Sequence, residues 1–317
     1  MMNTPVCDFV RAYAEKKALR LHMPGHKGLG PLGIEALDIT EIEGADSLFE
    51  ADGILRESEE NASALFGCPT FYSTEGSSLC IRAMLYLSRL HALSSGRRPL
   101  VLAGRNAHKT FLSALALLDI DVEWLYPAQE SSYLACPLDA QALEQAFAGA
   151  SAPPGAVYIT SPDYLGHVAD IAALAEVCHR HGALLLVDNA HGAYLRFLPE
   201  SMHPMELGAD LCCDSAHKTL PVLTGGAYLH IARHLPALAA SAKDALALFG
   251  STSPSYLLLQ SLDAANPYLE GYPARLRDFC GHAARFKDAL RAHGYQLIEE
   301  EPLKATILAR AFGYSGR

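Results

Sequence analysis

Apolar and polar positions follow two alternating patterns between residues 97 and 188. Short apolar runs indicate strands, and longer runs with one apolar face indicate helices. The predicted elements are strand 97–104, helix 107–119, strand 121–126, helix 138–150, strand 155–160, helix 170–182 and strand 183–188. Short apolar strands that alternate with helices predict a mostly parallel sheet covered by helices on both faces.

Polar or ionisable residues follow several of the predicted strands, including two further short strands at 69–74 and 208–213. The segments are "EGSS" (75–78), "RNAHK" (105–109), "SPDYLGH" (161–167), "NAHGAY" (189–194) and "DSAHK" (214–218). In open α/β sheets, ligands bind outside the carboxyl ends of the strands. These segments are therefore the first candidates for a functional site.

Lys218 lies in an unusual setting for a lysine. Asp214, Ser215 and Thr219 are its polar neighbours, and an apolar, glycine-containing run typical of a strand follows. An ordinary surface lysine lies among other charges on a solvated face. Because burial disfavours the ammonium form, a lysine in a pocket of this kind can lose its proton and act as a nucleophile.

Each of the other candidates, taken alone, also has a structural explanation. Ser77 lies at a predicted helix start, where it could help to hold a phosphate or could simply cap the helix. Asp188 could cap the next turn or face a cation. A single histidine such as His108 or His191 more often has a structural role than a functional one. A metal site of Asp188, His191 and His217 is conceivable, but the spacing matches no common metal signature.

Taken together, these residues match the requirements of one cofactor. Pyridoxal phosphate needs a phosphate cradle, an aspartate at its pyridine nitrogen, an imidazole that stacks on its ring and a lysine that forms a Schiff base. The segment 75–78, Asp188, His108 and Lys218 offer these parts, with Lys218 placed 30 positions after Asp188. The aspartate would keep the ring nitrogen protonated, so that the ring can act as an electron sink.

The composition of the 317 residues is that of a globular protein, with 50% hydrophobic and 19% charged residues. This length suffices for one large domain and part of another. The formal net charge of −10 argues against a nucleic-acid partner or an anionic membrane surface, because both require a basic face.

The eight cysteines form no C-x-x-C pair, so neither a zinc ribbon nor a disulfide framework is indicated. The first residues contain no apolar core of signal-peptide length, and no apolar run approaches the roughly 20 residues that span a bilayer. We therefore expect a reduced, cytoplasmic protein.

The ordered motifs resemble those of the Orn/Lys/Arg decarboxylase family of fold-type-I pyridoxal-phosphate enzymes, in particular its shorter bacterial members. The resemblance extends over nearly the whole chain, and the lysine segment is similar to the cofactor-attachment signature of the family. The similar segments are "LHMPGHKG" (21–28), residues 38–67, "YSTEGSS" (72–78), "RNAHKT" (105–110), "VDNAHGAY" (187–194), "DSAHKTLPVLTGGAYLH" (214–230) and "STSPSYLLLQSLDAA" (251–265).

The resemblance implies a role for four residues around the cofactor ring. Lys218 matches the lysine that forms the Schiff base. Asp188 matches the partner of the pyridine nitrogen, and His108 matches the histidine that stacks on the ring. Ala190 would then lie against the opposite face of the ring.

The resemblance also implies how the phosphate is bound. Ser77 and Ser78 match the phosphate-binding pair of the family. Ser215 and His217 match the Ser-x-His sequence before the lysine, which contacts the phosphate and the surroundings of the lysine. Thr252, which follows a predicted helix at 235–250, matches a threonine that reaches the phosphate of the neighbouring subunit. A homodimer with shared active sites is therefore expected.

Three positions depart from the family pattern. Asn189 replaces a glutamate or serine, Glu75 replaces an asparagine, and "LTGG" (223–226) replaces a Leu-Thr-Gln-small pattern. None of these changes removes a group that the cofactor chemistry requires, but they bear on substrate preference.

The expected architecture is a three-layer α/β large domain at residues 41–264. An N-terminal arm at 1–40 precedes it, and a linking helix with an incomplete C-terminal small domain follows at 265–317. The expected function is decarboxylation of arginine, lysine or ornithine to the amine, as in polyamine biosynthesis. The sequence does not identify the carboxylate that meets the distal cation of the substrate. The alternatives are an aminotransferase or another lyase of the same fold, and a non-catalytic remnant that binds the cofactor or a full-length partner.

Overall fold

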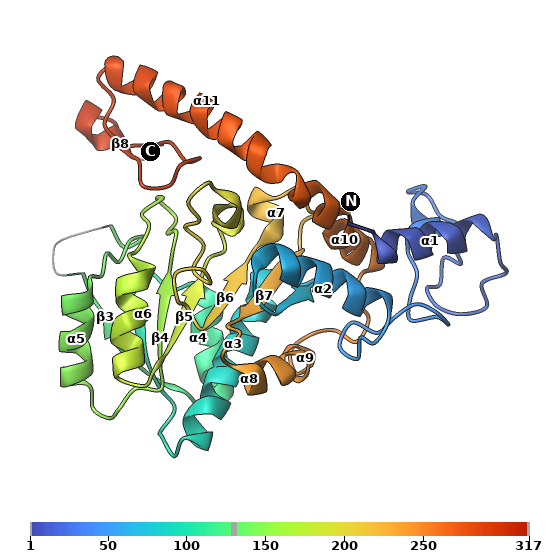
Figure 1. The fold of residues 1–317 in the computed structure, drawn as a ribbon, viewed down its shortest axis with the longest axis horizontal. Helices are drawn as coiled ribbons and strands as arrows, with labels where there is room; N and C mark the ends of the chain where they lie inside the picture. Colours follow the sequence, from blue (N-terminus) through green and yellow to red (C-terminus); the bar gives the residue numbers. More distant parts are fainter. Residues whose placement is uncertain (1, 128–131, 316–317) are drawn as a thin grey trace.

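A computed structural model describes residues 2–127 and 132–315 of the chain (Figure 1). Its centre is a seven-stranded sheet with the strand order β1-β7-β6-β5-β4-β2-β3. The strands are β1 (Thr70–Ser73), β2 (Leu100–Gly104), β3 (Asp121–Leu125), β4 (Ala156–Thr160), β5 (Leu184–Asp188), β6 (Leu211–Asp214) and β7 (Ala227–Ile231). In this sheet β7 is antiparallel to both of its neighbours and the other pairs are parallel. The predicted mostly parallel sheet is confirmed.

The strand directions bring the predicted segments to one edge of the sheet. β1 is antiparallel to β7, and β7 is antiparallel to β6, so β1 runs in the same direction as β6. The carboxyl ends of β1, β2, β4, β5 and β6 therefore share an edge. The register places Thr160 beside Asp188, and Asp188 beside Cys213.

Helices cover both faces of the sheet (Figure 1). Helices α3, α4, α8 and α9 pack on one face, against side chains such as Ala103 and Tyr158. Helices α5 and α6 pack on the other face, against Leu102 and Val157. Because successive side chains of a strand point to opposite faces, strands buried on both sides carry continuous apolar runs. The elements are α2 (Ile54–Phe66), α3 (Gly76–Ser94), α4 (Lys109–Leu118), α5 (Ala140–Gly149), α6 (Ile171–Arg180), α8 (Pro236–Ala240) and α9 (Ala242–Ala247), with the short η2 (Ala193–Phe197) and α7 (Ala216–Thr219) at the carboxyl edge.

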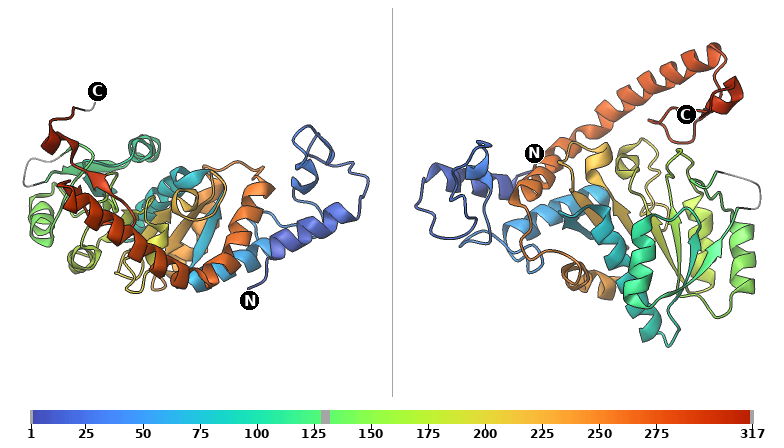
Figure 2. Two further views of the ribbon diagram at one scale, coloured as in Figure 1. Left: turned by 90° about the horizontal axis from the view of Figure 1, so that it is seen from above. Right: turned by 180° about the vertical axis from the view of Figure 1, so that it is seen from behind.

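The N-terminal segment packs on the body through one helix and again near Ile39 and Leu48, and the chain between these two contacts projects from it. Helix α1 (Pro5–Glu15) buries Val6 and Val10 in a core that it shares with α2 and α10 (Tyr256–Glu270). The chain between α1 and α2, which contains η1 (Glu35–Leu37), extends away from the sheet in both views of Figure 2.

The C-terminal segment begins with the long helix α11 (Tyr272–Ala292), which contacts η2 near the carboxyl edge of the sheet (Figure 1). The strands β8 (Leu297–Ile298) and β9 (Thr306–Ile307) form a small antiparallel pair, and η3 (Ala309–Phe312) follows. Residue 1 of the predicted arm and residues 316–317 of the predicted small domain lie outside the described residues. The predicted boundary at residue 264 falls within the continuous helix α10, which ends just before Gly271.

The predicted helix at 235–250 is wrong as a single element. The structure has two short helices there, α8 and α9, with Ser241 between them. Ser241 has ψ 2°, outside the helical range, and its hydroxyl donates to Ala237 O at 3.2 Å. Serine hydroxyls that bond to a nearby carbonyl compete with regular helix geometry.

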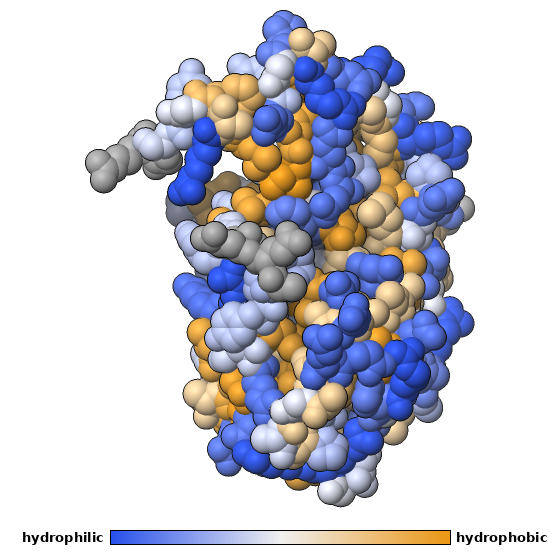
Figure 3. All heavy atoms as spheres, turned by 90° about the vertical axis from the view of Figure 1, so that its left-hand side faces the viewer, coloured by the Kyte–Doolittle hydropathy of each residue, from blue (hydrophilic) through white to orange (hydrophobic). Residues whose placement is uncertain are grey.

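The described residues contain no helix that combines the length and the apolar character needed to cross a membrane. The face shown in Figure 3, which is the left-hand side of Figure 1, intersperses hydrophilic and hydrophobic residues. Such a mixture is expected where helices bury one side against a sheet and expose the other.

Candidate active site

A cavity of about 600 Å³ opens at the carboxyl edge of the sheet. Residues from all the predicted strand-end segments line it. Of the predicted site residues, only Thr252 does not line it. Those that do are Ser77, Ser78, His108, Asp188, Ala190, Ser215, His217 and Lys218. The fold therefore brings together side chains that are up to 141 positions apart in the chain.

Asp188 ends β5 and is a buried carboxylate on the cavity wall, with 3% of its surface exposed. Its Oδ2 accepts a hydrogen bond from Tyr158 OH at 3.0 Å, and its Oδ1 accepts one from Ala190 N at 3.2 Å. Burial raises the pKa of Asp188, and the hydrogen bond from Tyr158 opposes this rise only in part. A cationic group placed against Asp188 would favour its ionised form.

The start of α3 gathers hydroxyl groups from three elements. Ser215 Oγ donates to Ser77 Oγ at 2.8 Å, and Ser78 Oγ lies 3.2 Å from Thr110 Oγ1. The alternative that Ser77 caps this helix is wrong, because the cap position is Glu75 and no side chain bonds there. Backbone N–H groups, hydroxyls and the positive end of a helix dipole together suit a phosphate.

His108 has a structural role and also lines the cavity. It caps α4, where its Nδ1 accepts a hydrogen bond from Thr110 N at 3.3 Å. Because Nδ1 accepts, the ring proton of the neutral imidazole lies on Nε2. The cap fixes the position of a ring that forms part of the cavity wall.

Lys218 lies in α7, and its Nζ is 3.3 Å from His191 Nε2. Burial, together with the positive charges of Lys218 and Lys304, lowers the pKa of His191 to about 4. His191 is therefore neutral near pH 7 and can accept a hydrogen bond from the lysine. The burial expected for Lys218 is not observed, because its side chain is exposed at the cavity wall.

His217 lies beside Lys218 and is oriented by the backbone of the next loop. Its Nδ1 lies 3.0 Å from Gly226 O, and a carbonyl can only accept, so Nδ1 donates. The other ring nitrogen, Nε2, is then the acceptor of the neutral ring. His217 lines the cavity together with Ser215.

Thr160, Tyr133 and Leu134 line the cavity but lie outside the predicted strand-end segments, and Tyr164 lies within one of them but was given no role. Thr160 Oγ1 is buried and has no hydrogen-bond partner among the described residues. Tyr164 packs edge-on against His191, with ring centroids 5.9 Å apart. Thr160 is the last residue of β4, so the strand-end rule could have found it if applied to the last strand residue as well as to those after it.

Thr252 lies apart from these residues. It is exposed in the loop between α9 and α10 and does not line the cavity. The adjacent Ser251 N donates to Glu75 Oε1 at 2.6 Å, which ties this loop to the start of α3.

The described donors fit pyridoxal phosphate. The wall combines a hydroxyl-lined helix start, a buried carboxylate, a lysine and the unpartnered hydroxyl of Thr160. Arg105, Lys109 and Lys218 give it an excess of positive charge, which suits a phosphate dianion. A metal ion at Asp188, His191 and His217 has no such support, because the group of possible metal ligands found among the described residues lies elsewhere.

Comparison with solved structures shows which class of protein has this fold. Lysine decarboxylase A from Pseudomonas aeruginosa superimposes with a TM-score of 0.76 and 21% identity, over 94% of this chain and 45% of that one. The Francisella novicida lysine decarboxylase LdcF gives a TM-score of 0.74 and 18% identity, over 92% and 44% of the two chains. The fold is thus shared with part of these two lysine decarboxylases.

The chain belongs to the Orn/Lys/Arg decarboxylase family, whose major domain matches residues 4–308. An arginine decarboxylase from Halalkalibacterium halodurans is 29% identical over 99% of this chain and 68% of its own length. An uncharacterised Bacillus subtilis protein, YaaO, has the same identity and coverage. The chain thus spans about two thirds of these relatives and less than half of the solved lysine decarboxylases.

Proposed function

We propose that this chain binds pyridoxal phosphate in the cavity at the carboxyl edge of the sheet and decarboxylates a basic amino acid, namely arginine, lysine or ornithine. The observation that carries the proposal is that the buried Asp188 and the amine of Lys218 line one cavity, together with the hydroxyl-lined start of α3. Membership of the decarboxylase family supports the same reaction.

We propose that the phosphate is held at the start of α3. Ser77 and Ser78 contribute hydroxyls and the backbone N–H groups of the first helical turn. Ser215, already bonded to Ser77, and His217, whose Nδ1 is bonded to a backbone carbonyl, complete the polar wall. These four residues follow β1 and β6, which run in the same direction with β7 between them.

When bound, the cofactor supplies an electron sink for the electron pair that remains on the α-carbon after carbon dioxide leaves. Asp188 holds a proton on the pyridine nitrogen, because a buried carboxylate favours a neighbouring cation. His108 and Ala190 confine the ring between them. The Oγ1 of Thr160 is available for a polar atom of the ligand.

Lys218 provides the amine for covalent attachment, and His191 serves as its partner. The neutral His191 Nε2 accepts a hydrogen bond from Lys218 Nζ at 3.3 Å, which aims the amine along the cavity wall. The amine and the imidazole together can hold a proton close to the reacting carbon.

We also propose that the protein is a homodimer in which Thr252 reaches the cavity of a second copy. The exposed position of Thr252, outside the cavity of its own chain, is what such sharing requires. Large apolar side chains are exposed on the projecting segment, with Leu19 and Leu21 each 84% exposed. Exposed apolar patches of this kind mark association surfaces.

We also propose the division into an N-terminal arm at 1–40, a large domain at 41–264 and a C-terminal part at 265–317.

A second candidate is an aminotransferase or another lyase of the same fold. The shortage of acidic groups on the cavity wall favours it. Asp188 is the only carboxylate among the described lining residues, and the first proposal already uses it to bind the cofactor. A basic substrate needs an acid for its distal cation. Under the first proposal, a second copy of the chain supplies that acid.

Incubation of the purified protein and pyridoxal phosphate with arginine, lysine and ornithine separates these functions. A decarboxylase releases carbon dioxide and the amine from at least one of them, and the Lys218→Ala variant releases neither. A transaminase produces a keto acid instead. No product with any of the three would contradict the decarboxylase assignment and favour a binding role.

A further inference from the structure

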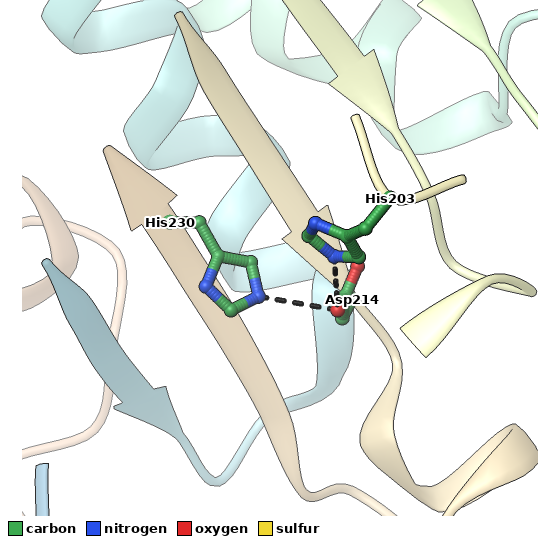
Figure 4. Close-up of side chains that lie close together, drawn as sticks. All are labelled: His203, Asp214 and His230. Atoms are coloured by element: carbon green, nitrogen blue, oxygen red, sulfur yellow. Dashed lines mark hydrogen bonds and ion pairs between the residues drawn. The ribbon is translucent and has the colours of Figure 1, made fainter. Parts of the chain in front are cut away.

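Asp214, the last residue of β6, forms a buried cluster with two histidines (Figure 4), and the next residue, Ser215, lines the cavity. Its Oδ2 accepts hydrogen bonds from His203 Nε2 at 3.0 Å and from His230 Nε2 at 3.1 Å. All three side chains have 0% exposure. The other oxygen, Oδ1, accepts from Asn189 Nδ2 at 2.6 Å. A weaker contact comes from the thiol of Cys212 at 3.8 Å.

The carboxylate of Asp214 is ionised despite its burial. Burial alone would raise the pKa of Asp214, but the interactions with His203 and His230 outweigh it and hold the pKa well below its usual range. Burial also lowers the pKa of His230, which favours the neutral imidazole. A buried anion of this kind is stable only while its donors stay in place.

The cluster has the spacing of a metal site, because its donor atoms all lie within 4.8 Å of one another. The hydrogen bonds argue against a metal ion. Met205 N donates to His203 Nδ1 at 3.4 Å, which leaves the ring proton on Nε2. That nitrogen then donates to Asp214 and has no lone pair for a cation. The distances from Asp214 to both imidazoles are those of ordinary hydrogen bonds.

The cluster connects two strand ends that carry the candidate cofactor residues. Asn189 directly follows Asp188, and its backbone N donates to Cys213 O at 3.0 Å. Ser215 directly follows Asp214 and donates to Ser77 in the cavity. The bond between Asn189 and Asp214 therefore ties the end of β5 to the end of β6 at the floor of the site.

We propose that Asp214 is a positioning residue for the cofactor site. Held by His203 and His230, it anchors Asn189, and it thereby sets the spacing between Asp188 and the segment that contains Ser215 and Lys218. The inference rests on the proposed function, because it concerns how the cavity is shaped for pyridoxal phosphate. It assigns this role to a carboxylate that touches neither cofactor nor substrate.

Asp210, the residue just before β6, offers a control, although its two histidines are partly exposed. Asp210 is also buried, and its carboxylate accepts from His179 Nε2 and His234 Nε2, each at 3.0 Å. It also accepts from Leu185 N at 2.7 Å and so joins β6 to β5. Asp210 thus repeats the chemistry of Asp214 at the edge of the sheet away from the cavity.

The test compares Asp214→Asn with Asp210→Asn in the full chain. Both substitutions replace a buried carboxyl group held by two histidines, so both should lower the melting temperature. We expect only Asp214→Asn to weaken pyridoxal-phosphate binding, by about tenfold or more, since it loses charge-assisted hydrogen bonds at the site. It should also shift the visible absorption band of the bound cofactor, while Asp210→Asn binds within about twofold of the wild type.

Equal effects of the two variants on cofactor binding would overturn the inference. So would a stoichiometric metal ion in the purified wild type that is lost from Asp214→Asn, because the cluster would then be a metal site. If Asp214→Asn does not fold, Asn189→Ser decides the matter. It keeps both histidine bonds to Asp214 and removes the link to β5. It should weaken cofactor binding more than Asp210→Asn does, although the loss of one buried donor should also lower the melting temperature. Unchanged binding in Asn189→Ser would contradict the proposal. A wild type that binds no pyridoxal phosphate would instead overturn the proposed function itself.

Discussion

Lys218 Nζ and His191 Nε2 lie 3.3 Å apart on the cavity wall. The contact joins the segment after β5 to the segment after β6. Because the low pKa of His191 keeps its ring neutral, the pair places an amine and a proton acceptor side by side.

The charge of Asp188 is expected to matter more than its shape. Asp188→Asn keeps the side-chain volume but removes the anion that would stabilise a protonated ring nitrogen. We expect turnover to fall by at least about 100-fold, the scale of a few kcal/mol of transition-state stabilisation. Tyr158→Phe is the control, because it removes a hydrogen bond to Asp188 and leaves the charge. The turnover of Tyr158→Phe should fall by less than about tenfold. Near-normal turnover in Asp188→Asn would refute the role given to this carboxylate.

Thr160→Val should act in opposite directions on stability and on binding. The hydroxyl of Thr160 is buried without a partner among the described residues, so its removal should leave the free protein equally or more stable. If the hydroxyl serves the ligand, pyridoxal phosphate should bind about tenfold more weakly. Thermal melting without cofactor and equilibrium titration with it measure the two effects. A large drop in melting temperature with unchanged binding would assign Thr160 to the structure alone.

His191 should make stability depend on pH. Its pKa is about 4 in the folded protein, against 6.5 ordinarily, so the unfolded chain takes up a proton between these values and the folded chain does not. The free energy of unfolding should therefore fall as the pH falls from about 6.5 to 4. His191→Gln should show a weaker decrease over this range, and the contribution of His230, whose pKa is also lowered, cancels in the comparison. Denaturant unfolding of both proteins at several pH values tests this. If the free energy of unfolding changed with pH in the same way in both proteins, the prediction would be contradicted.

The alternation of apolar runs was enough to predict the central strands and the edge at which the site lies. Those strands are buried on both faces, so their pattern depends little on distant residues. The helix at 235–250 was mispredicted because the backbone at Ser241 leaves the helical range, a local break that the apolar pattern does not reveal.

The cluster around Asp214 could not be predicted in the same way. His203 comes from a loop, and His230 from β7, whose antiparallel register with β6 places it next to Cys212. Only the tertiary structure shows that both imidazoles meet one carboxylate. Thr160 was missed for a simpler reason. It is the last residue of β4, and the strand-end rule was applied only to residues after each strand.

Sharing of the active site between two chains predicts complementation. Lys218→Ala chains are mixed with chains carrying Thr252→Val, and the subunits are exchanged. In a mixed dimer with sharing, one of the sites has both residues intact, so cofactor binding or activity should partly recover. No recovery in chains shown to have exchanged would mean that each site is built within one chain. Leu21→Asp tests the association surface separately. A charge on the projecting segment should shift the protein from dimers toward monomers.

The most direct test of the central claim is to locate the cofactor on the chain. The purified protein is loaded with pyridoxal phosphate, reduced with borohydride and digested, and the modified peptide is identified by mass spectrometry. The account predicts a pyridoxyl group on Lys218, in the peptide that contains "DSAHKTL" (214–220), and none in the Lys218→Ala variant. A pyridoxyl group on another lysine, or on none, would contradict it.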